Sequence, residues 1–190
     1  MPNWCNNGIT LRHADPAMID RVQHPSTDGL LSEFLPTPKE LLETTAGAFG
    51  DPERQALLEA QQKANIAKYG YKDWYDWNIA NWGTKWDIDL ENVDRVDEYT
   101  LTAAFDSAWS PPIEAYQKLE ELGFEVEAFY NEPGVGFAGK YSNGVDECVE
   151  YSGANSNTVR ELVGEELDDY FGISEMMSEW EEYNEENQGE

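Results

Sequence analysis

Apolar and polar residues alternate along several short stretches of the chain, and this two-residue period predicts β-strands. In the clearest case, the apolar residues Phe124, Val126 and Ala128 share one face. Two helical patterns, over residues 16–22 and 113–122, separate the strands. The pattern predicts an α+β fold, with a mixed or antiparallel sheet and helices on one face. The predicted strands are residues 8–12, 99–105, 124–130, 137–141 and 148–151.

The stretch from about residue 39 to residue 97 interrupts this pattern and is interpreted as an insertion. Residues 51–69 are rich in Ala, Gln, Glu, Leu and Lys, which favour a helix, and Asp51 with Pro52 has the form of a helix start. Four tryptophans then follow closely. Because aromatic side chains bury large areas, we expect a buried cluster that fixes the insertion to the sheet. These residues are Trp74, Trp77, Trp82 and Trp86.

The last part of the chain, residues 155–190, is predicted to be an acidic helical segment that follows a domain of residues 1–154. Thr158 and Glu161 have the spacing of a capping box at its start. A second helix carries two stripes about 100° apart. No Lys or Arg follows Arg160, so no ion pair within this helix relieves its charge. The apolar stripe is Ile173, Met176, Trp180 and Tyr183, and the acidic stripe is Glu175, Glu179, Glu182 and Glu186.

The formal net charge of −27 bears on the partners of the protein more than on its fold. DNA binding draws on Lys and Arg that neutralise phosphates, and the chain has only 12 of these residues. We therefore expect no direct nucleic-acid ligand, and the expected partner is a host protein with a basic surface. The alternative left open is that the acidic residues only keep the protein soluble.

The sequence also bears on the compartment of the protein. No stretch approaches the roughly 18 apolar residues that a membrane span needs, and the first residues lack the regions of a signal peptide. Cys5 and Cys148 belong to no CxxC motif or Cys/His cluster, so both are interpreted as reduced structural residues. We expect a cytoplasmic protein without a cofactor, and the oligomeric state stays open.

Two patterns resemble ligand-binding motifs in the wrong context. Residues 134–139 spell Gly-x-Gly-x-x-Gly, the dinucleotide fingerprint, but they lie between two predicted strands with no helix after them. The favoured interpretation is a hairpin turn with close strand packing.

Residues 87–98 place acids at four positions of a calcium loop, but Arg95 takes the ninth position and no EF-type helices flank the segment. This segment is interpreted as a solvated acidic connector, with adventitious divalent-cation binding left open. The four acids are Asp87, Asp89, Glu91 and Glu98.

The residue types that carry catalysis are scarce or uninformative. His13 and His24 are the only imidazoles, and neither stands next to a plausible nucleophile. The chain has 39 acidic residues, so the presence of any particular pair of carboxylates is no evidence for an acid–base catalytic site. No catalytic or metal-binding residue is therefore predicted, and a hydrolase or transferase is the third-ranked hypothesis.

Four short motifs match one known pattern: residues 2–5 (PNWC), 35–41 (LPTPKEL), 81–87 (NWGTKWD) and 108–112 (AWSPP). By these motifs the chain resembles the YubB-like family of ferredoxin-like proteins carried by phages and plasmids, over residues 2–145. The resemblance implies a ferredoxin-like split β-α-β sandwich, and it implies no activity because the family is functionally uncharacterised. The motif residues of interest are Asn3, Trp4, Asn81, Trp82, Thr84, Lys85, Trp86, Asp87 and Trp109.

The polar residues within these motifs allow two interpretations. They form either a buried hydrogen-bond network or an exposed binding surface. The network is favoured because polar groups among tryptophans need partners when they are buried, and Lys85 and Asp87 offer an ion pair. These polar residues are Asn3, Asn81, Thr84, Lys85 and Asp87.

Two functional hypotheses of different class follow. The first is a non-enzymatic interaction protein that occupies a basic, nucleic-acid-binding surface of a host factor, as an anti-defence inhibitor or DNA mimic would. Carboxylates three and four residues apart on a helix lie about 4.5–6 Å apart, within a factor of two of the phosphate repeat of one DNA strand. The partner-binding candidates are therefore the glutamates of the acidic stripe. The rival is a regulatory or structural ferredoxin-like module that binds a protein or small ligand.

Overall fold

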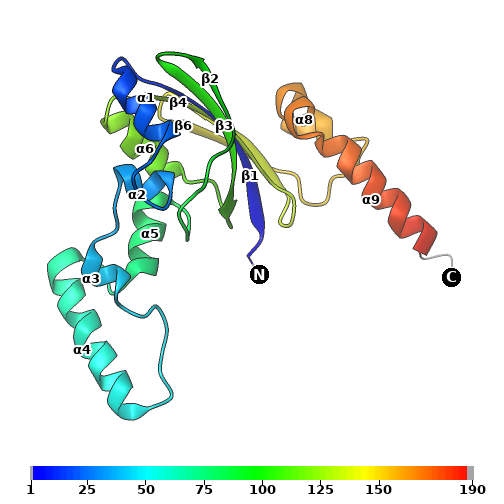
Figure 1. The fold of residues 1–190 in the computed structure, drawn as a ribbon. Coiled ribbons are helices and arrows are strands. Elements are labelled where there is room, and N and C mark those ends of the chain that lie inside the picture. Colours follow the sequence, from blue (N-terminus) through cyan, green and yellow to red (C-terminus); the bar gives the residue numbers. More distant parts are fainter. Residues whose placement is uncertain (1, 188–190) are drawn as a thin grey trace.

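Figure 1 shows the computed structural model of the protein, which describes residues 2–187 and the side chains up to residue 185. Six strands form one antiparallel sheet in the order β2-β3-β1-β4-β5-β6, and the α+β prediction is confirmed. The central strand β1 pairs with β3 and β4, so that Ile9 lies between Ala103 and Ala128. The strands are β1 (Trp4–Arg12), β2 (Glu91–Asp97), β3 (Thr100–Ala108), β4 (Glu125–Glu132), β5 (Phe137–Ser142) and β6 (Val145–Glu150).

One face of the sheet is covered by α1 (Pro16–Gln23), α2 (Leu30–Phe34) and α6 (Ile113–Glu121), as Figure 1 shows. Side chains alternate across a strand, so every second residue of β1, β3 and β4 points into this main core. The helices close the core from the other side. Fully buried members are Leu11, Leu101 and Val126 from the strands and Ile19, Tyr116 and Leu119 from the helices.

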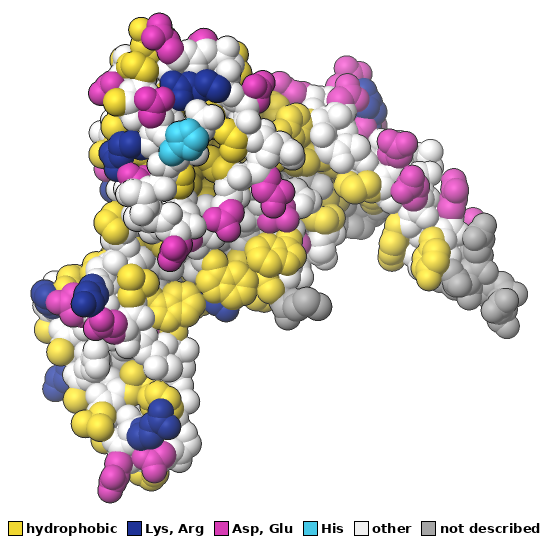
Figure 2. All heavy atoms as spheres, viewed as in Figure 1, with side chains coloured by type: hydrophobic (Ala, Val, Ile, Leu, Met, Phe, Trp, Pro, Cys, Tyr) yellow, Lys and Arg dark blue, Asp and Glu magenta, His cyan; other side chains and the backbone are white. Residues whose placement is uncertain are grey.

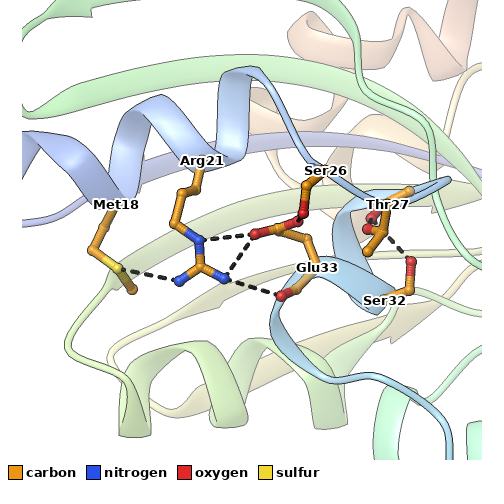
Figure 3. A network of polar contacts seen from close by, with 7 residues as sticks. Met18, Arg21, Ser26, Thr27, Ser32 and Glu33 are labelled. Carbon is orange, nitrogen blue, oxygen red and sulfur yellow. Dashed lines mark hydrogen bonds and ion pairs between the residues drawn. The ribbon is translucent and has the colours of Figure 1, made fainter.

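A polar network joins α1 to α2 at the edge of the main core (Figure 3). The Arg21 guanidinium donates to the Glu33 carboxylate at 2.8 Å and lies over the Phe34 ring, 4.5 Å from its centroid. The amide and hydroxyl of Ser26 donate to the other oxygen of this carboxylate. Hydrogen bonds from Ser26 and then from Arg21 lower the pKa of Glu33 to about 2. The ionised carboxylate therefore fixes the loop between the two helices.

The insertion forms a helical arm, whose longest helix α4 extends away from the sheet (Figure 1). The helix predicted over residues 51–69 is confirmed, and the Asp51 carboxylate caps it by accepting from the Arg54 amide at 2.8 Å. Leu58 and Asn65 are its buried residues, so tertiary contacts reach it at few points. The helices of the arm are α3 (Lys39–Leu42), α4 (Pro52–Tyr69) and α5 (Trp74–Trp82).

The arm ends earlier than the sequence pattern predicts. The predicted boundary at about residue 97 is wrong, because residues 91–97 form β2, which pairs with β3 at the edge of the sheet. Arg95 of this strand donates to the Asp20 carboxylate of α1 at 2.9 Å. Residues 91–97 are therefore part of the sheet and not a solvated connector. Charged side chains are common on edge strands, where they oppose pairing with other chains.

The C-terminal helices pack against part of the other face of the sheet, so the prediction of helices on one face alone is wrong. Leu167 and Ile173 from these helices pack with Ala138 of β5 and with Tyr151 in a second apolar cluster. The Tyr170 ring meets the Phe129 ring of β4 edge to face, with centroids 5.2 Å apart. The helices are α7 (Val159–Val163), α8 (Glu165–Phe171) and α9 (Ile173–Asn187).

The capping box predicted at Thr158 and Glu161 is not formed in the described structure. The Thr158 hydroxyl instead donates to the backbone carbonyl of Asn155, and it accepts from the Asn155 amide. It therefore closes the turn before α7. None of the described helices is long and apolar enough to cross a membrane.

Candidate functional site

The last helix, α9, is held in place along one side. Ile173 is fully buried in the second apolar cluster, and Met177, one turn later, packs against the same cluster. One further turn on, the Glu181 carboxylate accepts from the amide of Ser156 at 2.9 Å and from its hydroxyl at 2.7 Å. The hydroxyl and then the amide of Ser156 lower the pKa of Glu181. These residues share one face at a spacing of four, so α9 is fixed over two turns.

A buried carboxylate joins the three C-terminal helices. Asp168 of α8 accepts from the Ser174 amide at 2.7 Å, from the Ser174 hydroxyl at 2.8 Å and from Arg160 of α7 at 2.7 Å. Desolvation raises the pKa of Asp168, but the hydrogen bonds from Ser174 and Arg160 outweigh it, and the pKa lies below its ordinary value. The start of α9 is therefore oriented by an ionised group.

The predicted acidic stripe lies on the outward side of α9. Glu175, Glu179 and Glu182 are exposed, and the side chain of Glu186 lies outside the described residues. The predicted apolar stripe is divided: Ile173 is buried, whereas Met176, Trp180 and Tyr183 are 45%, 68% and 65% exposed. The inward face runs through Ile173 and Met177. Since each residue advances about 100° around a helix, the apolar residues at 176, 180 and 183 form a separate outward stripe beside the glutamates.

Three of the four motif segments lie together in space. The Trp109 amide donates to the Asn3 carbonyl at 3.0 Å, and the Thr84 hydroxyl donates to the Ala108 carbonyl at 3.0 Å. The Ser110 hydroxyl donates to the Gly83 carbonyl at 2.7 Å. Residues 2–5, 81–87 and 108–112 are therefore neighbours, although they are far apart in the sequence.

The fourth motif segment joins them through a buried indole. Trp82 is 3% exposed, and its Nε1 donates to the Leu35 carbonyl at 2.9 Å. The Trp77 ring packs edge to face against it, with centroids 5.9 Å apart. The predicted aromatic cluster that fixes the insertion is thus found at Trp77 and Trp82.

Other tryptophans of the motifs are on the surface. Trp4, Trp86 and Trp109 are 46%, 39% and 52% exposed, and the rings of Trp4 and Trp86 lie 6.0 Å apart. The backbone of Trp109 has φ +77°, a left-handed conformation that is costly for a bulky residue. For Trp86 the prediction of a buried position is wrong. We call these three residues, with Tyr75 and Lys85, the tryptophan surface.

The polar motif residues are divided between core and surface. Thr84 is fully buried, and the Asn81 side chain donates to the Trp77 carbonyl. Within the described residues, the predicted ion pair of Lys85 with Asp87 is not formed. The Asp87 carboxylate instead accepts from the first amides of α2, those of Leu31 and Ser32. Helix N-termini favour a negative group in this position, which accounts for the difference.

The Lys85 side chain lies against two aromatic rings of the tryptophan surface. Its ammonium lies 4.5 Å from the centroid of the Trp86 ring and 5.9 Å from that of the Tyr75 ring. These distances are typical of cation–π contacts, in which the face of an aromatic ring attracts a cation. The aromatic faces of this surface are therefore able to hold a positive charge.

The glycine pattern lies in a hairpin, as predicted. Gly134 and Gly136 lie in the turn between β4 and β5, and Gly139 lies inside β5, opposite Tyr130. A Cβ at Gly139 would lie 2.5 Å from the backbone carbonyl oxygen of Glu147 and would also meet the Tyr130 hydroxyl. Gly139 therefore allows the backbones of β5 and β6 to approach closely.

Replacing Gly139 by Ala is expected to lower the free energy of unfolding by about 1–3 kcal/mol, because an added methyl group must push a neighbouring backbone away. The measurement is urea denaturation. Gly50→Ala is the matched control, since a Cβ at Gly50 meets nothing within 4 Å. A Gly139→Ala protein as stable as the control would show that close packing is not the reason for this glycine.

The described residues offer little for catalysis or metal binding. They contain no group of three or more His, Cys, Asp or Glu side chains placed to hold a metal ion. The ring of His13 packs on Phe124, with centroids 4.8 Å apart, and Cys148 is an exposed free thiol. Burial raises the pKa of the free Cys5 thiol to about 12, so this thiol stays protonated and unreactive at neutral pH.

Comparisons with known proteins add a distant likeness. No family model matches the chain, and no curated protein matches it. It is similar to a solved structure described as protein api92 from Yersinia pseudotuberculosis, of the family model DUF1281. The two share 13% sequence identity with a TM-score of 0.42, over 80% of this chain and 98% of the other. The resemblance to the YubB-like family stays a prediction.

Proposed function

We propose that the protein is a non-enzymatic interaction protein that uses α9 to bind a basic, nucleic-acid-binding surface of a host protein. The observation that carries this proposal is the outward side of α9, where Glu175, Glu179 and Glu182 lie beside exposed apolar residues on a helix anchored from behind. A phage or plasmid inhibitor that imitates the charge of DNA would act in this way.

A ferredoxin-like core belongs to the same proposal. The element order β1-α1-β2-β3-α6-β4, with α2 and the arm placed between α1 and β2, supports a split β-α-β unit. The four strands lie in the order β2-β3-β1-β4, and β5 and β6 extend the sheet beyond β4. The second apolar cluster includes Ala138 of β5 and Tyr151, which directly follows β6, so the acidic segment packs in part on this extension.

The charge of α9 supports a basic partner. The glutamates at 175, 179 and 182 are three and four residues apart, which corresponds to about 4.5–6 Å along the helix axis. The last cation of the chain, Arg160, is already bound to Asp168 and Asp169, at 2.7 and 2.6 Å. A partner with Lys and Arg at DNA-phosphate spacing would meet this uncompensated charge. Such steering acts mainly on the association rate and on specificity.

The apolar residues of α9 supply the second part of the interaction. Met176, Trp180 and Tyr183 stand at i, i+4 and i+7, the spacing by which an amphipathic helix enters a groove. Tryptophan and tyrosine are frequent among residues that dominate binding energy. Since Met177 and Glu181 anchor the neighbouring side of α9, the helix is already ordered and little ordering entropy is lost when the partner binds.

The experiment compares two variants with the same change in net charge. In one, Glu175, Glu179 and Glu182 are changed to Gln. In the other, three exposed glutamates elsewhere, Glu53, Glu125 and Glu161, are changed to Gln. A partner is first captured from host lysate at rising salt and purified, and association is then measured by surface plasmon resonance.

We expect the α9 variant to associate about tenfold more slowly at low salt and to show a weaker salt dependence, because local charge steers the encounter. The control variant should associate like the parent. Nucleic acid should compete for the partner, while the protein itself binds no duplex DNA. Equal rates for all three proteins would contradict the proposal, and the acidity would then serve solubility alone.

A further inference from the structure

A groove of about 500 Å³ lies between the α5–α6 side of the molecule and the β4–β5 turn with β6. Its apolar lining comes from Ile79 of α5, Pro111 and Ile113 at the start of α6, and Val135 and Phe137 around the turn. Ile79 and Val135 are exposed. The groove is therefore an open apolar trough and not a closed part of the core.

The charge of the groove has one sign. Glu114, Asp146 and Glu150 line it, and its described lining includes no Lys or Arg. The larger cavity of about 690 Å³ on the open face of the sheet differs, because Lys140 lies there within 3.7 Å of Glu166 and compensates part of its charge. An uncompensated acidic rim around an apolar trough is complementary to a ligand that is both basic and apolar.

Several residues that line the groove are neighbours, along the chain, of residues of the tryptophan surface. Tyr75 and Ile79 are one turn apart on α5, so the ring that faces the Lys85 ammonium adjoins the residue that lines the groove. On the other side, Ser110 and Pro111 of the lining directly follow Trp109. Figure 2 shows hydrophobic side chains gathered in a band between the helical arm and the sheet.

The walls of the groove are fixed before any ligand arrives. The Tyr130 hydroxyl donates to the Asp146 carboxylate at 2.6 Å, which holds one acidic group at the rim. The Ser110 hydroxyl joins the start of α6 to Gly83 at the end of α5. A site with positioned walls loses little entropy on binding.

We propose that this groove binds a basic peptide segment of a partner protein. An apolar side chain of the segment occupies the trough between Ile79 and Val135. Flanking Arg or Lys side chains pair with Glu114, Asp146 and Glu150. One of these cations also makes a cation–π contact with an aromatic ring of the neighbouring tryptophan surface, of the same kind as the contact made by Lys85. This site is separate from α9 and does not depend on the function proposed for that helix.

The test uses synthetic peptides of sequence RRLRR, RRSRR and EELEE, acetylated and amidated, titrated into the ¹⁵N-labelled full chain. RRLRR is expected to bind with a dissociation constant below about 1 mM and to shift the backbone amides of the groove and the indole resonances of Trp86 and Trp109. RRSRR, which lacks the apolar anchor, should bind about tenfold more weakly. EELEE should not bind.

A variant with Glu114→Gln, Asp146→Asn and Glu150→Gln should bind RRLRR about tenfold more weakly, while the side-chain amide oxygen introduced by Asp146→Asn still accepts from Tyr130. The α9 variant with three Gln residues serves as the control and should bind the peptide like the parent. The proposal would be overturned by any of four results. These are shifts confined to α9, shifts spread over the whole acidic surface, equal binding of RRLRR and RRSRR, and no binding. Loss of peptide binding at the groove would leave the partner association measured for α9 unchanged, so the two proposals fail separately.

Discussion

Replacing Trp82 by Ala is expected to lower the free energy of unfolding by about 3–5 kcal/mol. The indole is 3% exposed and belongs to the main core, so its removal leaves a large cavity. The substitution also removes the indole N–H that donates a hydrogen bond to the backbone carbonyl of Leu35, a residue between α2 and the arm. Both losses act at the junction of arm and sheet. The measurement is urea denaturation followed by circular dichroism.

Trp86→Ala is the matched control, because it removes the same side chain from the same motif at a 39% exposed position. It is expected to cost about 1 kcal/mol, mostly from the contacts with Trp4 and Lys85. Equal losses for the two variants would show that the tryptophan surface is part of the core in solution. A Trp82→Ala protein of parental stability would contradict the packing of the arm.

The elements that could be predicted from the sequence are those with a local signal. The strand near residue 126 and the helix over 51–69 follow from alternation, composition and capping, which act between close neighbours. β2 has no such signal, because its residues are mostly charged and its place is decided by pairing with β3. The same segment matches a calcium loop in part, and for this reason it is interpreted from the sequence as an acidic connector and not as a strand.

The candidate surfaces show the same limit. Helical spacing alone identifies the stripe of Glu175, Glu179 and Glu182, but it does not say which side of α9 faces the protein. That depends on Met177 and on Glu181, whose partner Ser156 is 25 residues away. The exposure of Trp86 likewise depends on Trp82 taking the core position in the same motif. Long-range packing, which one sequence does not display, decides both.

Replacing Asp168 by Ala is expected to destabilise the C-terminal helices by about 3 kcal/mol, near the upper end of the range for hydrogen bonds to a charged group. Its side chain is 2% exposed, and its loss leaves the Ser174 amide and hydroxyl without their acceptor. Hydrogen exchange of the amides in α7 to α9 measures this local effect. The main sheet should keep the protection it has in the parent.

The same carboxylate gives the C-terminal helices a dependence on pH. Because the pKa of Asp168 is lowered in the folded protein, its stabilisation is present above the ordinary Asp value of about 3.9 and is lost as the pH falls through the lower folded-state value. The difference in protection between the parent and the Asp168→Ala variant should therefore be full at pH 7 and shrink below about pH 4.

Asp169→Ala is the control for both measurements. Asp169 also binds Arg160, at 2.6 Å, but its side chain is 66% exposed, and an exposed ion pair contributes about 0–1 kcal/mol. The control should therefore leave α9 protected. If Asp169→Ala exposes α9 as much as Asp168→Ala does, the charge of Arg160 and not the buried hydrogen bonds to Ser174 holds the helix. If neither variant changes the exchange, the contacts of Ile173, Met177 and Glu181 are enough to fix α9, and the orienting role of Asp168 is refuted.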